Sequence, residues 1–345
     1  MCGIIGVSKP AGNAIIETYD GLMMLQHRGQ DSAGIVTFDE NKFCEQRGAG
    51  LVIDIFTQKN IANLTGRFGL GHCRYTTAGN SESLEEAQPF FVNAPFGIFL
   101  IHNGNLTNTN ELRDRIQNTY RRHLRTDSDT EVLLNVFADK IYQELKAAPK
   151  RSDVDTVFAA TKKLMKRVTG AYSVISLIDK VGLFAFRDPY GIRPLVFGKK
   201  KTTKGTEWIF ASEDVAIKTL GYEVVRDVNP GEAILITKDG EMISQQCAEG
   251  KLFPCIFEYI YLARPDSMLN EISVYKTRLR MGSSLAKQIK AANLEIDSVM
   301  PVPDSGRPIA LQISQDLGIK YREGLVKNRY IGRTFIMPGQ SQRQK

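Results

Sequence analysis

The chain has 345 residues, of which 42% are hydrophobic and 24% are charged, as is typical of a globular protein with two domains. No apolar run approaches the ~18 residues that span a bilayer, and the first residues do not resemble a signal peptide. We therefore expect a cytoplasmic protein without a membrane span. The formal net charge is +7, and residues 321–345 hold six Lys and Arg against one acid. This density is low for a nucleic-acid arm and fits a small phosphorylated ligand.

The five cysteines are odd in number and form no Cys-x-x-Cys pair, which argues against a disulfide framework or a zinc site. One of them, Cys2, directly follows Met1. If Met1 is removed, Cys2 carries a free α-amine beside its own thiol. An α-amine titrates near 7.7–8.0 and a thiol near 8.5, so the neutral amine can take the thiol proton. Alternatively, Cys2 is a small hydrophobic residue of a first strand.

The first part of the chain combines short apolar strands with amphipathic helices. Helical spacing of apolar residues predicts helices over residues 14–26, 110–121, 129–146 and 154–168. Strands are expected over residues 34–38, 68–74, 97–102, 172–178, 183–187, 195–198, 208–211 and 233–237, the last forming a hairpin with residues 241–244. Many strands with helices inserted as a block predict a layered α/β sandwich.

The pattern changes near residue 249. Beyond it, expected strands over residues 257–262, 298–302 and 320–324 alternate with helices over 274–292 and 308–317. This alternation is typical of a parallel, doubly wound sheet, although only two βα units are complete. We therefore divide the chain into domains of residues 2–249 and 250–345, the second of them incomplete.

Three polar stretches follow apolar strands of the first domain. Arg74 could bind a carboxylate through two parallel bonds, or form a surface salt bridge. Asn103 and Gly104 offer two N–H donors for an oxyanion, or form a type I′ turn. The acids of residues 127–131, Asp129 among them, could hold an ammonium group, or cap a helix. Together with a thiol, these groups would suit an amino acid with an electrophilic side chain.

Five motifs resemble the class II glutamine amidotransferase domain, which has the N-terminal-nucleophile hydrolase fold, an α/β (α+β) four-layer αββα sandwich. They lie at residues 1–6, 26–35, 71–75, 102–106 and 128–131. The resemblance implies that Cys2 attacks the glutamine amide and that Asn103 and Gly104 form the oxyanion hole. It also implies that ammonia leaves from a thioester, and that the glutamine backbone groups are held by Arg74, Thr77 and Asp129.

The second domain is similar to the amidophosphoribosyltransferases, glutamine-dependent enzymes that open purine synthesis. The similarity lies in residues 257–267, 301–306 and 327–336. It implies a type I phosphoribosyltransferase domain that binds phosphoribosyl pyrophosphate with Mg²⁺. The residues that it assigns to this substrate are Asp304, Ser305, Lys327, Tyr330 and Arg333, with Ser305 also near the metal. Alternatively, these residues form only a basic surface loop and a turn after a strand.

The chain departs from that family in one respect. It has no apolar strand that ends in two acids before a Thr/Gly-rich loop, the motif with which these enzymes hold the ribose and the 5-phosphate. The family also continues beyond the position of Lys345, so we expect a truncated chain with an incomplete transferase half. Cys255 matches a cluster-binding position of one branch of the family, but the other ligands are missing, and we expect no iron–sulfur cluster.

We therefore predict an enzyme that acts on glutamine and phosphoribosyl pyrophosphate, assembles as a homo-oligomer and binds neither nucleic acid nor membrane. One alternative is a truncated relative that is only a glutaminase, or that binds ligands without catalysis. Another is a sister class II enzyme such as a glucosamine-6-phosphate synthase. Residues 301–306 and 327–336 argue against this last alternative.

Overall fold

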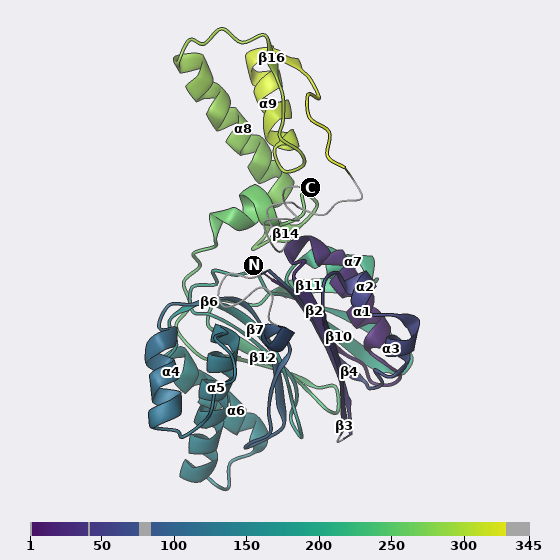
Figure 1. Ribbon diagram of the computed structural model, residues 1–345, viewed down its shortest axis with the longest axis vertical. Coiled ribbons are helices and arrows are strands. Elements are labelled where there is room, and N and C mark those ends of the chain that lie inside the picture. Colours follow the sequence, from purple (N-terminus) through teal and green to yellow (C-terminus); the bar gives the residue numbers. More distant parts are fainter. Residues whose placement is uncertain (1, 41, 76–83, 329–345) are drawn as a thin grey trace. The chain divides into compact units, whose positions relative to one another are not determined.

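The computed structural model describes residues 2–40, 42–75 and 84–328. This part of the chain forms two compact units, whose boundary in the sequence lies between Pro254 and Cys255 (Figure 1). Among the described residues, no helix has the length and apolar character that a membrane crossing requires.

A seven-stranded antiparallel sheet in the first unit has the order β11-β9-β10-β1-β4-β2-β3. β1 lies at its centre, and all six of its residues are buried. Because both faces of this strand are covered, its residues Gly3–Val7 are apolar without alternation. The strands of this sheet are β1 (Gly3–Ser8), β2 (Ser32–Asp39), β3 (Lys42–Ala49), β4 (Phe68–Arg74), β9 (Val196–Thr202), β10 (Gly205–Ala211) and β11 (Glu223–Asp227).

The second sheet has six antiparallel strands in the order β13-β12-β8-β7-β6-β5. Its last two strands in sequence form the hairpin that the sequence predicts, with Leu235 opposite Ile243. The strands of this sheet are β5 (Phe90–Val92), β6 (Ile98–Leu106), β7 (Gly170–Ile178), β8 (Gly182–Arg187), β12 (Glu232–Thr237) and β13 (Met242–Gln246).

Helices cover the outer face of each sheet, and the two inner faces pack on each other through a cluster that includes Ile4, Leu70 and Ile175. The seven-stranded sheet is covered by α1 (Ile15–Met24), α2 (Val52–Ile55), α3 (Gln58–Ala62) and α7 (Asp214–Thr219), and the six-stranded sheet by α4 (Thr109–Asn118), α5 (Asp129–Ala147) and α6 (Asp153–Met165). Figure 1 shows these helices on the two outer sides of the sheets. The predicted αββα sandwich is confirmed.

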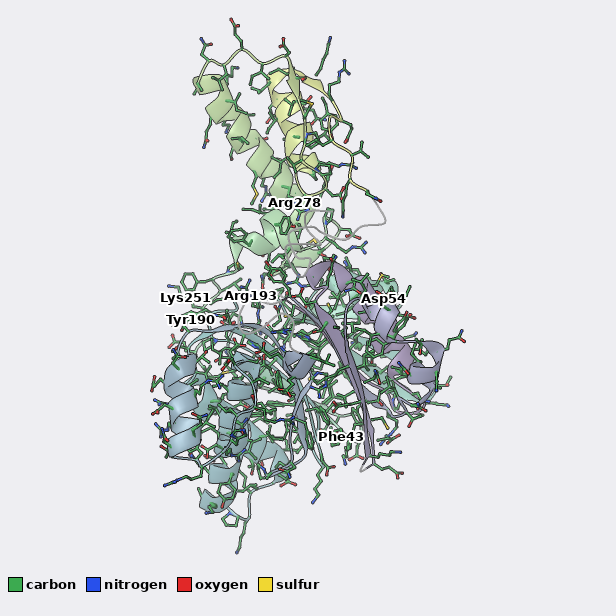
Figure 2. The ribbon with its side chains drawn as sticks, viewed as in Figure 1. Phe43, Asp54, Tyr190, Arg193, Lys251 and Arg278 are labelled. Carbon is green, nitrogen blue, oxygen red and sulfur yellow. The ribbon has the colours of Figure 1, made fainter. Side chains whose placement is uncertain are left out.

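The second unit begins with a helical segment where we predicted a strand. Residues 257–262 were expected to be extended, but Glu258–Leu262 form a π-helical turn, η3. Hydrogen bonds from the buried guanidinium of Arg278 (Figure 2) favour a helical turn over a strand here. The guanidinium donates to the carbonyl oxygens of Tyr259 (2.8 Å), within the turn, and Ala263 (2.9 Å), which follows it. Such bonds satisfy groups that the end of a helical turn leaves without partners.

The remaining elements of this unit follow the predicted order. A short hairpin, β14 (Met268–Leu269) and β15 (Ile272–Ser273), leads into α8 (Val274–Ala291). β16 (Ser298–Val299), α9 (Arg307–Leu317) and β17 (Lys320–Tyr321) then form a parallel βαβ unit, with Ser298 opposite Lys320. The parallel pairing is confirmed, although both strands are shorter than predicted.

Candidate functional site

Cys2 lies at the start of the central strand of the seven-stranded sheet. Its neighbour Gly3 pairs with Cys73 of β4, and two residues later Ile5 pairs with Ala211 of β10. Only 8% of Cys2 is exposed. A side chain at position 3 would not fit, since its Cβ would lie 2.6 Å from Sγ of Cys73. Glycine at this position therefore lets β1 approach β4, and this approach fixes the place of Cys2.

The side chain of Asn103 reaches Cys2 from the other sheet. The backbone nitrogen of Cys2 donates to Oδ1 of Asn103 at 3.0 Å, and Asn103 is fully buried. Its Nδ2 atom has no hydrogen-bond partner in the described part of the chain. A buried donor without a partner costs about 1–3 kcal/mol, so such groups are rare unless a ligand satisfies them. The unpartnered amide N–H therefore marks a place for an acceptor beside Cys2.

Asn103 and Gly104 lie within β6, so the alternative of a type I′ turn is wrong. The apolar run that precedes them continues as a strand through Leu106, with Gly104 opposite Tyr172. Any Cβ at position 104 would lie 1.9 Å from the carbonyl oxygen of Ala171. The close pairing of β6 and β7 therefore requires glycine here.

Two further groups contact Cys2. Its Sγ lies 3.7 Å from the carbonyl oxygen of Tyr75, and its own carbonyl oxygen accepts a bond of 3.0 Å from Nε of Arg28. The sequence motifs indicated no role for Arg28, although residue 28 lies in one of the motifs that carry the resemblance. Arg28 stands in the polar run of residues 26–31, so its local pattern did not signal that it would be buried. What it contacts could not be derived from local sequence.

The thiol of Cys73 lies in the neighbouring strand but is chemically different. It is fully buried, and its Sγ donates to the carbonyl oxygen of Leu25 at 3.3 Å. Burial raises the pKa of the Cys73 thiol to about 12. This thiol therefore stays protonated near neutral pH and cannot act as a nucleophile there.

Arg74 is buried at the end of β4, so the alternative of a surface salt bridge is wrong. Its Nη2 atom contacts Oε2 of Glu86 at 2.5 Å, and Glu86 is buried as well. The carboxylate partner holds the guanidinium in place inside the protein. Thr77, which the resemblance assigns to the glutamine backbone groups together with Arg74 and Asp129, lies outside the described residues.

Asp129 is the first residue of α5, and Ser128 rather than Asp129 is the N-cap, since its hydroxyl accepts from the backbone nitrogen of Thr130. Oδ2 of Asp129 accepts from the backbone nitrogen of Leu106 at 3.0 Å, and Oδ1 lies 3.9 Å from Nδ1 of His102. These contacts tie the start of α5 to the end of β6. They bring an acid to the strand that also carries Asn103.

Two buried histidines lie in the strands beneath these groups. Burial lowers the pKa of His102, although the carboxylate of Asp129 acts in the opposite direction. Burial, together with the positive charge of Arg74, lowers the pKa of His72 well below its ordinary value. Both imidazoles are therefore neutral near pH 7. Nδ1 of His102 lies 3.1 Å from Oγ1 of Thr130, which orients its ring.

In the second unit, Asp304 and Ser305 precede α9, whose N-cap is Gly306. Nζ of Lys327 lies 3.5 Å from Oδ2 of Asp304. Tyr330 and Arg333 lie outside the described residues. No cluster of three or more His, Cys, Asp or Glu side chains suited to a metal occurs in the ranges that the structure describes. The carboxylate and hydroxyl oxygens of residues 304 and 305 nevertheless fit Mg²⁺, which is commonly bound by one or two carboxylates together with substrate phosphates.

Known proteins are similar to this chain over nearly all of its length. A family model described as a glutamine amidotransferase domain matches residues 72–219. The amidophosphoribosyltransferase of Pseudomonas aeruginosa is 50% identical over 348 residues, which cover 100% of this chain and 68% of that protein. The corresponding proteins of Escherichia coli and Saccharomyces cerevisiae are 49% and 45% identical, with 68% of each covered.

Among solved structures, glutamine phosphoribosylpyrophosphate amidotransferase of B. subtilis, in complex with ADP and GMP, matches with a TM-score of 0.81 at 34% identity. The match covers 99% of this chain and 70% of that one. About half of the residues are thus identical to those of curated relatives, and the fold is shared along the whole chain. This chain belongs to the amidophosphoribosyltransferase family.

Proposed function

We propose that the chain hydrolyses glutamine through Cys2 and delivers the ammonia to phosphoribosyl pyrophosphate, forming 5-phosphoribosylamine. The observation that carries this proposal is the contact between Cys2 and Asn103. The backbone nitrogen of Cys2 lies 3.0 Å from Oδ1 of Asn103, and the buried Nδ2 of Asn103 has no hydrogen-bond partner among the described residues. The Cys2 thiol, this nitrogen and the Asn103 amide donor therefore support one common site. A nucleophile, its base and an oxyanion donor are the three groups that acyl transfer requires.

In the first step, the α-amine that Cys2 gains when Met1 is removed takes the thiol proton. Sγ attacks the side-chain carbonyl carbon of glutamine. The α-ammonium group of Cys2 then gives its proton to the amide nitrogen, the C–N bond breaks, and ammonia leaves. The product is a thioester between Cys2 and the γ-glutamyl group. Water, deprotonated by the same amine, then attacks the thioester and releases glutamate and the thiol. In both steps the oxyanion accepts hydrogen bonds from Nδ2 of Asn103 and the backbone N–H of Gly104.

The backbone groups of glutamine are assigned to three residues. Arg74, held from behind by Glu86, binds the α-carboxylate together with the hydroxyl of Thr77. Asp129 binds the α-ammonium. Burial supports these roles for Arg74 and Asp129, which are 5% and 9% exposed, because ion pairs are stronger where water is excluded. The substrate would then be recognised by its charges and cleaved at its amide.

Phosphoribosyl pyrophosphate would bind to the second unit. Asp304 and Ser305 would meet the diphosphate and its Mg²⁺, with Lys327, Tyr330 and Arg333 supplying attraction from the loop that follows. Mg²⁺ supplies charge neutralisation of the leaving diphosphate when it is bound. The location of Ser305 before α9 supports this assignment, because helix N-termini attract phosphate. We divide the function between domains of residues 2–249 and 250–345, in a cytoplasmic homo-oligomer.

The test is ammonia release from glutamine by the purified chain, with and without phosphoribosyl pyrophosphate, together with its intact mass. We expect a mass without Met1 and hydrolysis that the Cys2→Ala substitution abolishes. Cys44→Ala, a change at a half-buried cysteine of β3, is the matched control and should keep full activity. Undiminished release by the Cys2→Ala chain would reject the assignment. Glutamine binding without hydrolysis by the unsubstituted chain would favour a non-catalytic relative.

A further inference from the structure

We propose that Glu213 is a positioning residue for the nucleophile, acting on Cys2 through the guanidinium of Arg28. This inference rests on the proposed function, in which Cys2 is the nucleophile. Nothing in the amidotransferase motifs of the sequence includes residue 213, which lies far along the chain from the site.

The contacts form a chain of buried polar groups. Nε of Arg28 donates to the carbonyl oxygen of Cys2 at 3.0 Å, and Nη1 of the same guanidinium contacts Oε1 of Glu213 at 2.5 Å. Arg28 and Glu213 are both fully buried. One rigid, planar group therefore spans from the carboxylate to the backbone of the nucleophile. Because the guanidinium cannot bend, the direction of its Nε–H follows from where the carboxylate holds it.

A second side chain, His27, also holds the carboxylate. Nε2 of His27 lies 2.8 Å from the same Oε1 atom of Glu213, and Nδ1 of His27 lies 3.1 Å from the carbonyl oxygen of Met24. The carboxylate is thus contacted by two neighbouring side chains, His27 and Arg28, of the short helical turn that follows α1. It joins the segment of residues 26–28 to the start of α7.

The residue before Glu213 holds the same strand. Ser212 follows β10 directly. Its hydroxyl accepts from the backbone nitrogen of Ile4 at 3.0 Å, and its own backbone nitrogen donates to the carbonyl oxygen of Ile4 at 3.0 Å. Two consecutive residues between β10 and α7 therefore fix positions 2 and 4 of the chain. Residue 4 is held directly, and residue 2 is held through Arg28.

A buried ion pair is weak evidence for stability, since apolar residues of similar volume often serve as well. The location of this pair favours a geometric role. The thiol and the α-amine of Cys2 act at short range on one carbonyl carbon, and a displacement of about 1 Å can lower a rate about 10²-fold. A group that holds the Cys2 carbonyl still would therefore raise kcat and leave glutamine binding nearly unchanged.

The principal variant is Glu213→Asp, which keeps the charge and shortens the reach by one methylene group. We expect kcat for glutamine hydrolysis to fall roughly 10- to 100-fold, with KM within about threefold of the original value. The matched control is Glu232→Asp. Glu232 is also buried and receives two bonds of 2.7 Å from Arg226, but it lies in β12, and its carboxylate also accepts from the backbone nitrogen of Asn229 and the hydroxyl of Ser244. This control should lower the melting temperature and keep kcat.

A double variant, Arg28→Met with Glu213→Leu, separates positioning from stability, because it removes the pair without leaving a buried charge. We expect it to melt near the temperature of the original chain while its kcat stays at least as low as that of Glu213→Asp. Original kcat in the folded double variant, or an effect of Glu213→Asp on the melting temperature alone, would overturn the inference. If the unsubstituted chain released no ammonia after loss of Met1, the proposed function would fail first, and the role of Glu213 with it.

Discussion

Oδ1 of Asn103 accepts a hydrogen bond of 3.0 Å from the backbone nitrogen of Cys2, which lies 101 positions earlier in the chain and in the opposite sheet. The same side chain therefore has two tasks in the proposed reaction. Its Oδ1 orients the nitrogen of Cys2, which serves as the base, and its Nδ2 donates to the oxyanion. Both tasks depend on the two sheets being packed face to face.

Asn103→Ala should lower the kcat of glutamine hydrolysis by roughly 10²–10³, because an oxyanion donor acts mainly on the transition state. KM for glutamine should change little. The control is Asn105→Ala, two residues along the same strand, where the exposed side chain donates to the carbonyl oxygen of Leu106. Steady-state kinetics of both variants checks the prediction. A rise in KM at unchanged kcat would show that Asn103 binds substrate instead.

Arg74→Ala should raise KM for glutamine by roughly 10- to 100-fold, because a charge-assisted bond contributes about 1.5–3 kcal/mol. It should also destabilise the protein by about 3–5 kcal/mol, since Glu86 would remain buried without its partner. The control is Arg67→Ala, which removes a pair with Asp39 that is partly exposed and contributes little. If Arg74→Ala does not fold, Arg74→Lys keeps the charge and loses the two-pronged bond. An unchanged KM in a folded Arg74 variant would contradict the assignment.

Stability should fall as the pH drops from about 7 to about 5. Burial lowers the pKa of both His72 and His102 in the folded state, so the unfolded chain binds more protons once the pH falls below the ordinary value of about 6.5. Each histidine contributes a slope of up to about 1.4 kcal/mol per pH unit in this window. Urea unfolding at several pH values measures the slope. His72→Gln should reduce it, and His123→Gln, a change of an exposed residue, should not.

Lys327→Ala should weaken the binding of phosphoribosyl pyrophosphate and make the remaining binding less sensitive to salt. The melting temperature should not change, because the pair with Asp304 is exposed, with 33% and 59% of the two side chains accessible, and such pairs contribute about 0–1 kcal/mol. Titration calorimetry at low and moderate ionic strength measures both effects. Lys320→Ala, which removes an exposed lysine of β17, serves as the control. Equal loss of affinity in both variants would mean that only net charge matters.

The central strands and the long helices could be predicted from the sequence because burial marks them. β1, β4 and α5 are almost wholly buried, and their apolar residues recur at strand or helix spacing. β3 was missed for the opposite reason. It is an edge strand whose residues are polar and partly exposed, so its place comes from pairing with β2 and not from its own pattern.

The site shows the same division. Cys2, Asn103 and Asp129 could be proposed as site residues because each stands in a local motif whose residue types indicate a chemical role. Glu213 could not, since its partner Arg28 lies 185 positions away and both are brought together only by the order of strands in the sheet. The π-helical turn at residues 258–262 was predicted as a strand, because a short apolar run fits a strand and a helix equally well.

The central position of β1 also determines when, during synthesis of the chain, the surroundings of Cys2 can form. The strand is bonded on one side to β4 and on the other to β10, whose last residue is Ala211, so the surroundings of Cys2 are complete only after more than two hundred residues have been synthesised. At translation rates of about 5–20 residues per second, this leaves roughly 10–40 s. During that interval the first peptide bond is open to an aminopeptidase. The α-amine of Cys2, the proposed nucleophile, would therefore be exposed by loss of Met1 while the chain is still on the ribosome, before the first unit has folded.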